Sequence, residues 1–198
     1  MKAPSRLPET PSQTAGPFVH IGLLPQVAGL ETPFSLGGEV AGPAVGGLRI
    51  RIEGVVRDGL GAPVRDAVLE AWQADGAGVF AHPADPRHAS VAPGFRGFAR
   101  AAADPETGAF GFQTIKPGPV GAMAPHIALW IVARGINRGL ATRLYFADEG
   151  ERNAACPVLG RIDPPERRET LLARPLGDGA YRFEIRLQGQ GETVFFDV

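Results

Sequence analysis

The sequence predicts an all-β protein with a β-sandwich core, preceded by an extended N-terminal arm and interrupted by one short helix near 163–173. Two patterns favour the sandwich. Apolar and polar residues alternate over several short segments, as in strands with one buried face. Glycine (27) and proline (19) are spread along the chain, so turn signals separate these segments. With 198 residues, 44% of them hydrophobic, the chain suits one domain with a sizeable core.

The first 47 residues differ from the remainder in composition. They contain many Pro, Gly, Ser and Thr residues and few periodic apolar positions. Residues 19–24 are their only strand-like piece, and Phe18 with its apolar neighbours should be buried against something. We therefore divide the chain into an arm at 1–47 and a β-sandwich domain at 48–198.

The strand pattern recurs through the predicted domain. The segment 48–56 alternates apolar and polar residues and is followed by the turn signal Asp58-Gly59. The segment 126–133 is a dense apolar run, which fits a central strand. The predicted strands are 48–56, 67–74, 109–115, 126–133, 142–146, 180–187 and 192–198.

One segment departs from the β pattern. Asp163 is a capping residue type, and the two prolines after it suit the first positions of a helix. Leu171 and Leu172 then give an apolar edge, and Pro175 stops the segment. These signals predict a short helix at about 163–173.

Composition excludes several classes of function. The net charge is −1, and the sequence contains no basic stripe that could bind a phosphate backbone. We therefore expect no nucleic-acid partner. The single cysteine, Cys156, allows no internal disulfide and indicates a reducing compartment. We see no secretory signal and no run of ~20 apolar residues, so we expect a cytoplasmic protein without a membrane partner.

The four histidines form no close metal-binding pair. His82 and His88 lie in a Pro- and Asp-rich loop and are expected to be solvated. His126 begins the apolar run at 126–133, and its simplest interpretation is a strand-end histidine bonded to the backbone. No nucleophile signature is present, and Cys156 is expected to be a small buried hydrophobe. We therefore predict no catalytic residue and no metal ligand set in this chain, so its chemistry should depend on a partner.

Arg134 follows the same apolar run, immediately before Gly135. An arginine at a strand end can present its planar fork to a carboxylate in two parallel hydrogen bonds. A surface or structural arginine is the alternative, and spacing alone leaves both interpretations open.

Several segments together resemble the intradiol ring-cleaving dioxygenases. They follow the family's order over nearly the whole chain, and the Trp72-Gln73 and Ile-Lys-Pro-Gly-Pro (115–119) elements are specific in combination. The segments that carry the resemblance are 10–18, 54–59, 69–75, 112–119, 124–127 and 142–146.

The resemblance also identifies what is missing. Members of this family hold a ferric ion with two tyrosines and two histidines, since ferric iron suits phenolate oxygen and imidazole nitrogen. The two tyrosine positions correspond to Phe80 and Val120 in this chain, and the histidine pair corresponds to His126 and Ala128. Three of the four ligands are absent, so His126 is the one surviving position.

This pattern is similar to that of the family's iron-free alpha subunits, which pair with an iron-bearing beta subunit. The resemblance implies that Fe(III) is bound by the beta subunit and not by this chain, and that the enzyme is active only as the pair. It implies intradiol cleavage of 3,4-dihydroxybenzoate with O2 to 3-carboxy-cis,cis-muconate. The arm at 1–47 would then pack on the partner chain.

Site residues follow from the same resemblance. It places Thr14, Gly16 and Pro17 beside the substrate and implies that Arg134 binds the substrate carboxylate. Phe18 stands where the family often has tyrosine, so it offers no hydroxyl. One alternative is a non-catalytic β-sandwich that binds a small molecule or acts as a scaffold. Another is a subunit of a related dioxygenase with a different catechol substrate.

Overall fold

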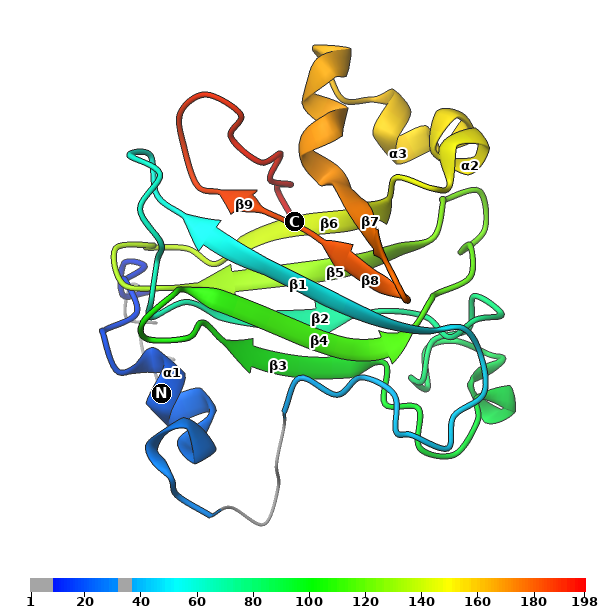
Figure 1. The fold of residues 1–198 in the computed structure, drawn as a ribbon, viewed down its shortest axis with the longest axis horizontal. Coiled ribbons are helices and arrows are strands. Elements are labelled where there is room, and N and C mark those ends of the chain that lie inside the picture. The colour runs from blue at the N-terminus through cyan, green and yellow to red at the C-terminus, as the bar shows by residue number, and fades with distance from the viewer. Residues whose placement is uncertain (1–8, 32–36) are drawn as a thin grey trace, which may run out of the picture.

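The structure is a computed structural model and describes residues 9–31 and 37–198. Its strands are β1 (Arg49–Arg57), β2 (Val68–Trp72), β3 (Phe98–Ala102), β4 (Ala109–Ile115), β5 (His126–Val132), β6 (Leu140–Phe146), β7 (Leu172–Gly177), β8 (Ala180–Arg182) and β9 (Ile185–Arg186). Within the described ranges these nine strands form one sheet in the order β3-β2-β5-β6-β7-β8-β1-β4, with β9 paired to β1. The sheet folds over near β7 and β8, so that β1 and β4 lie across β2 and β5 around a common core (Figure 1). The predicted all-β fold with a sandwich core is confirmed.

Alternation in the sequence builds the inner faces of both layers. Ile50 and Ile52 of β1 are buried, and Arg51 between them is exposed to solvent. Ile52 pairs with Phe112 of β4, which is buried in the same way. The apolar run at 126–133 becomes the predicted central strand, because β5 pairs with β2 on one side and β6 on the other.

A buried amide ties the two layers together just after β2. Gln73 is 1% exposed, and its Nε2 donates hydrogen bonds to the carbonyl oxygens of Ala74 and Ile115, both at 3.0 Å. The Thr114 hydroxyl donates to Gln73 Oε1 at 2.9 Å. A buried amide without hydrogen-bond partners would destabilise the fold. These bonds therefore explain how glutamine can be buried at position 73, directly after Trp72.

The prediction of a strand-like piece at 19–24 is wrong. This segment forms the helix α1 (Val19–Leu23), followed by the 3-10 helix η1 (Pro25–Ala28). It pairs with no strand among the described residues, so its backbone bonds locally, as when Leu24 N donates to His20 O at 2.8 Å. Phe18 is 73% exposed rather than buried.

The last part of the predicted arm packs on its own domain. Val40 and Ala41 are fully buried in the core. Val40 N donates to Gln113 O at 2.9 Å, and Gln113 N donates to Gly38 O at 2.8 Å, which fixes the segment beside β4. This stretch of the predicted arm is therefore part of the sandwich core.

The end of the chain also differs from prediction. The strand predicted at 192–198 is wrong, because this stretch makes only an isolated bridge between Phe196 and Ala141 of β6. The strand predicted at 180–187 is divided into β8 and β9, which pair with β1 on either side of Phe183. Gly54 of β1 allows this close crossing, since a Cβ atom there would lie 1.8 Å from Phe183 O.

Short helices close one end of the sheet. The helix predicted near 163–173 is the 3-10 helix η3 (Pro165–Leu171). The sequence did not predict α2 (Gly150–Ala155), α3 (Pro157–Gly160) or the 3-10 turn η2 (His88–Ser90). Figure 1 shows α2 and α3 at the opposite end of the molecule from α1. Cys156 lies between α2 and α3 and is 1% exposed, which confirms its prediction as a small buried residue.

None of the described helices is both long and apolar enough to cross a membrane.

Candidate functional site

The two residues that the sequence singled out lie at opposite ends of β5. His126 is the first residue of the strand, and Arg134 lies two positions after its last residue, Val132. Arg134 is eight positions along the chain from His126, which corresponds to roughly 25 Å for extended backbone. They therefore belong to two separate places on the molecule.

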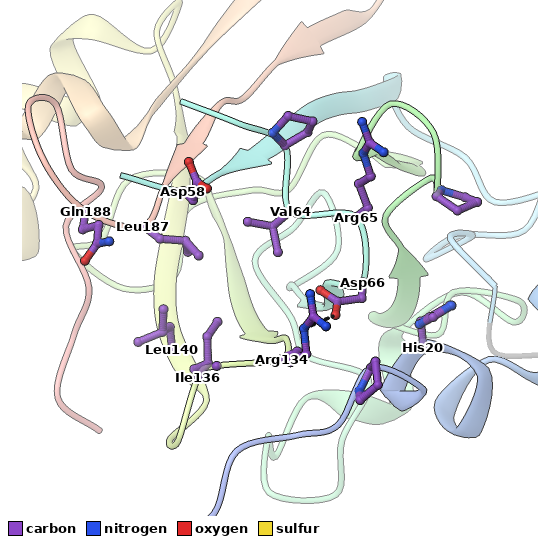
Figure 2. Close-up of a pocket in the computed structure, with 14 residues that line it drawn as sticks. His20, Asp58, Val64, Arg65, Asp66, Arg134, Ile136, Leu140, Leu187 and Gln188 are labelled. Carbon is purple, nitrogen blue, oxygen red and sulfur yellow. Dashed lines mark ion pairs between the residues drawn. The ribbon is translucent and has the colours of Figure 1, made fainter. Parts of the chain in front are cut away.

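A groove of about 670 Å³ opens beyond the Arg134 end of β5. Figure 2 shows that its walls come from segments far apart in sequence, including α1 with His20 and the stretch that leads into β2. Its lining includes Pro17, His20, Asp66 and Arg134.

The N-terminal arm is attached to this groove by specific bonds. Ala15 forms a parallel β-bridge with Arg134. Gly135 N donates a hydrogen bond of 2.7 Å to Thr14 Oγ1, and the same hydroxyl donates to Ala15 O at 2.9 Å. Since Pro17 lines the groove and Gly16 lies between it and the bridge, the structure brings Thr14, Gly16, Pro17 and Arg134 together. Their contact with a substrate remains a prediction.

The Arg134 side chain is open to solvent. It is 70% exposed, and its Nε lies 3.6 Å from Oδ2 of Asp66, whose side chain is only 20% exposed. This is the one ion pair of Arg134 within the described part of the chain. Because Asp66 approaches the Nε side, terminal N–H groups of the guanidinium are left for another anion.

His126 lies in a closed environment at the other end of β5. It is 8% exposed, and its Nδ1 donates to Ala124 O at 2.8 Å. Its ring packs against Tyr145, with 5.4 Å between the ring centroids. Burial lowers the pKa of His126, and the nearby positive charge of Arg143 lowers it further. The prediction of a strand-end histidine bonded to the backbone is confirmed.

The other three positions that the resemblance assigns to the family's iron site carry no donor atom. Phe80 stacks on Trp72 with a centroid separation of 5.8 Å and an interplanar angle of 6°. Val120 forms a tight turn with Met123.

The third of these positions, Ala128, pairs with Arg143 of β6. The Arg143 guanidinium lies 3.5 Å from Tyr145 Oη, close to His126. Hydrocarbon side chains and a nearby cation do not suit a ferric ion, so these residues do not fit one. Among the described residues, no group of three His, Cys, Asp or Glu side chains could hold a metal ion.

A network of ion pairs reinforces the His126 end of the sheet. Lys116 Nζ lies 2.8 Å from Asp148 Oδ2 and 2.9 Å from Glu149 Oε1, and Tyr181 Oη donates to the same Asp148 oxygen at 2.8 Å. Burial alone would lower the pKa of Lys116, but these hydrogen bonds hold it above its usual range. The lysine of the Ile-Lys-Pro-Gly-Pro element thus joins the end of β4 to the turn after β6.

Two residues of the groove, His20 and Asp66, were not predicted from the sequence as site residues. His20 belongs to the segment predicted as a strand, and Asp66 has no local signal that separates it from other loop acids. Asp66 could be found only from the pairing of β2 with β5, which the sequence does not specify. His82 and His88 are exposed in their loop, as predicted.

Comparison with known proteins identifies the family. Residues 39–189 match the family described as Dioxygenase. The chain belongs to this dioxygenase family.

Curated relatives of this dioxygenase chain include both kinds of subunit. The alpha chain of protocatechuate 3,4-dioxygenase from Pseudomonas putida is 48% identical over 200 residues, covering 96% of this chain and 97% of the relative. The beta chain from Burkholderia cepacia is 34% identical over 161 residues, covering 74% of this chain and 67% of the relative. Intradiol dioxygenases use iron.

A solved structure supports the fold alone. The dioxygenase domain of a carbohydrate-binding fusion protein from Streptomyces sp. SirexAA-E superposes with a TM-score of 0.59 at 24% identity. The match covers 83% of this chain and 93% of that one.

Proposed function

We propose that this chain is the iron-free alpha subunit of a protocatechuate 3,4-dioxygenase and acts only with its beta subunit. Fe(III) is bound by the beta subunit. The αβ enzyme inserts both atoms of O2 into 3,4-dihydroxybenzoate, between the two hydroxyl-bearing carbons, and forms 3-carboxy-cis,cis-muconate. The alpha chain contributes Thr14, Gly16, Pro17 and Arg134 to substrate binding at the ferric site. A cytoplasmic location is part of this proposal, from the lone thiol.

One observation carries the proposal, namely the distance between the two ends of β5. The Arg134 groove lies roughly 25 Å from His126, by the rise of a strand. A substrate with a single aromatic ring is too short to reach from one end to the other. An iron that reacts with a substrate held at Arg134 would therefore have to be supplied by another chain.

Recognition of the carboxylate is the task that suits Arg134. Burying a carboxylate without a partner costs several kcal/mol. A hydrogen bond to a charged group contributes about 1.5–3 kcal/mol, which offsets much of that cost. The exposed guanidinium becomes more effective once the beta subunit covers the groove, because its interaction with an anion strengthens as water is excluded.

The exposed side of the arm supports a partner at this groove. Large apolar residues of α1, η1 and their flanks are open to solvent, while Leu24 packs inward. The exposed ones are Phe18 (73%), Leu23 (37%), Val27 (43%) and Leu30 (57%). Apolar side chains gathered on one segment favour burial against another chain, as expected if the arm packs on the beta subunit.

Co-expression with a Tyr- and His-bearing homologue tests this function. We expect the two chains to purify together, to contain stoichiometric iron, and to consume oxygen when protocatechuate is added. The chain expressed alone should bind no stoichiometric iron and show no tyrosinate-to-iron charge-transfer colour.

Such a colour in the isolated chain, or failure of the pair to assemble, would contradict the proposal and favour a scaffold or binding role. A panel of catechols tested on the complex identifies the substrate.

A further inference from the structure

We infer that Asp66 is a positioning residue that holds the Arg134 guanidinium toward the substrate carboxylate. This inference rests on the proposed function of the Arg134 groove. Figure 2 shows the Asp66–Arg134 ion pair at the wall of that groove.

The sheet brings the two residues to the same end of neighbouring strands. Strands β2 and β5 are antiparallel, and the last pair of their ladder at this end is Val68 with Val132. Asp66 and Arg134 each lie two residues beyond that pair, where their side chains form the ion pair. The end of the ladder therefore keeps the two residues close in space.

Arg134 needs such a contact because its side chain is largely free. At 70% exposure an arginine samples many rotamers, and binding a carboxylate in two parallel bonds requires one of them. Asp66, at 20% exposure, is the less mobile partner of the pair. By engaging Nε it restricts the guanidinium while leaving terminal N–H groups for the substrate.

The backbone around Arg134 is already fixed. Ala15 bridges to Arg134, and Gly135 N donates to Thr14 Oγ1 at 2.7 Å. The freedom that remains is therefore in the side chain, and Asp66 is the group placed to restrict it.

The charge of Asp66 and its positioning of Arg134 have opposite effects on KM, so a measurement of KM can test the inference. The Asp66 carboxylate repels an anionic substrate, so if charge dominated, removing it would lower KM. If positioning dominates, removing it raises KM, because the substrate must then order the arginine itself.

The test uses the assembled αβ enzyme with Asp66→Ala and, as a milder change that retains a hydrogen-bond acceptor, Asp66→Asn. We expect KM for protocatechuate to rise about two- to tenfold, the size expected for ordering one long side chain, with kcat and iron content unchanged. Glu106→Gln removes a charge from an exposed neighbouring loop and should leave KM unchanged.

The same Asp66 changes are then made in an Arg134→Ala background. A positioning role predicts no further rise in KM there, whereas a merely structural role would raise KM in both backgrounds. An unchanged or lower KM in Asp66→Ala and Asp66→Asn would also overturn the inference. If Arg134→Ala itself leaves KM unchanged, the proposed function fails; if only the Asp66 variants lack an effect, the inference alone fails.

Discussion

The two ends of β5 differ in how they use charge. At the His126 end, the imidazole of His126 and the ammonium of Lys116 are mostly buried and have partners within the chain, namely Ala124 O for His126 and the two carboxylates of the Lys116 ion pairs. At the Arg134 end, the guanidinium is 70% exposed, and its one carboxylate partner among the described residues is Asp66 at 3.6 Å. The first arrangement stabilises a fold, and the second leaves binding capacity for something outside the chain.

The two ends of β5 are therefore expected to have different roles. The positions that the resemblance assigns to the family's metal site, Phe80, Val120 and Ala128, carry hydrocarbon side chains, and the buried end of the strand is occupied by packing contacts. The exposed end has kept a cation, a groove and an attached arm. Changes at one end should therefore alter stability without altering substrate binding, and changes at the other end should do the reverse.

The largest effect should come from Lys116 at the His126 end. Lys116→Met leaves Asp148 and Glu149 without their shared cation, so we expect the free energy of unfolding to fall by about 3 kcal/mol. This value is at the low end of the stability loss expected when a buried ion pair is broken, because the Asp148 side chain is 39% exposed. Urea denaturation of the purified chain measures it, and Lys116→Arg, which keeps the charge, should lose less. If the change in KM for protocatechuate, expressed as a free energy, exceeds the change in the free energy of unfolding, the proposed difference between the two ends of β5 is contradicted.

Arg134→Ala should show the opposite behaviour in the assembled enzyme. Loss of a charge-assisted bond predicts a KM for protocatechuate higher by about tenfold to a hundredfold. Iron content and stability should stay the same, since exposed ion pairs contribute about 0–1 kcal/mol. Arg134→Lys keeps the charge but loses the fork, so its KM should be intermediate. Steady-state oxygen uptake gives the answer, and an unchanged KM in Arg134→Ala would exclude a substrate-binding role.

A smaller effect concerns pH and His126. Burial lowers the pKa of His126 in the folded chain, whereas the histidine of the unfolded chain has the ordinary pKa of about 6.5. As pH falls below that value the unfolded state binds a proton that the folded state does not, so stability decreases. The slope from this residue is at most about 1.4 kcal/mol per pH unit.

His126→Gln should flatten that pH dependence in denaturation curves, while His88→Gln, at an exposed loop position, should not. Iron content of the assembled enzyme should be the same for both variants. A pH slope that survives in His126→Gln would assign the effect to another group.

Residues with a strong local pattern could be predicted, and those in weakly patterned segments could not. The dense run at 126–133 predicted β5, but the small residues of β3 (Phe98–Ala102) gave no comparable signal, and that strand was missed. The segment 19–24 has strand-like composition yet forms α1, whose backbone bonds locally and pairs with no strand among the described residues. The strand propensity of a segment determines its secondary structure only where tertiary contacts do not override it.

The sequence by itself was sufficient for the fold class and for Arg134 as a candidate carboxylate-binding residue, which depend on residue type and on periodicity along a few neighbouring positions. The resemblance to the intradiol dioxygenases was needed to identify Phe80, Val120 and Ala128 as the positions without iron ligands. The attachment of Thr14 to Gly135, the ion pair of Asp66 with Arg134, and the distance between the two ends of β5 were decided only by the tertiary structure. Each depends on strand register or on contacts between distant segments, and side-chain periodicity within one segment carries no information about either.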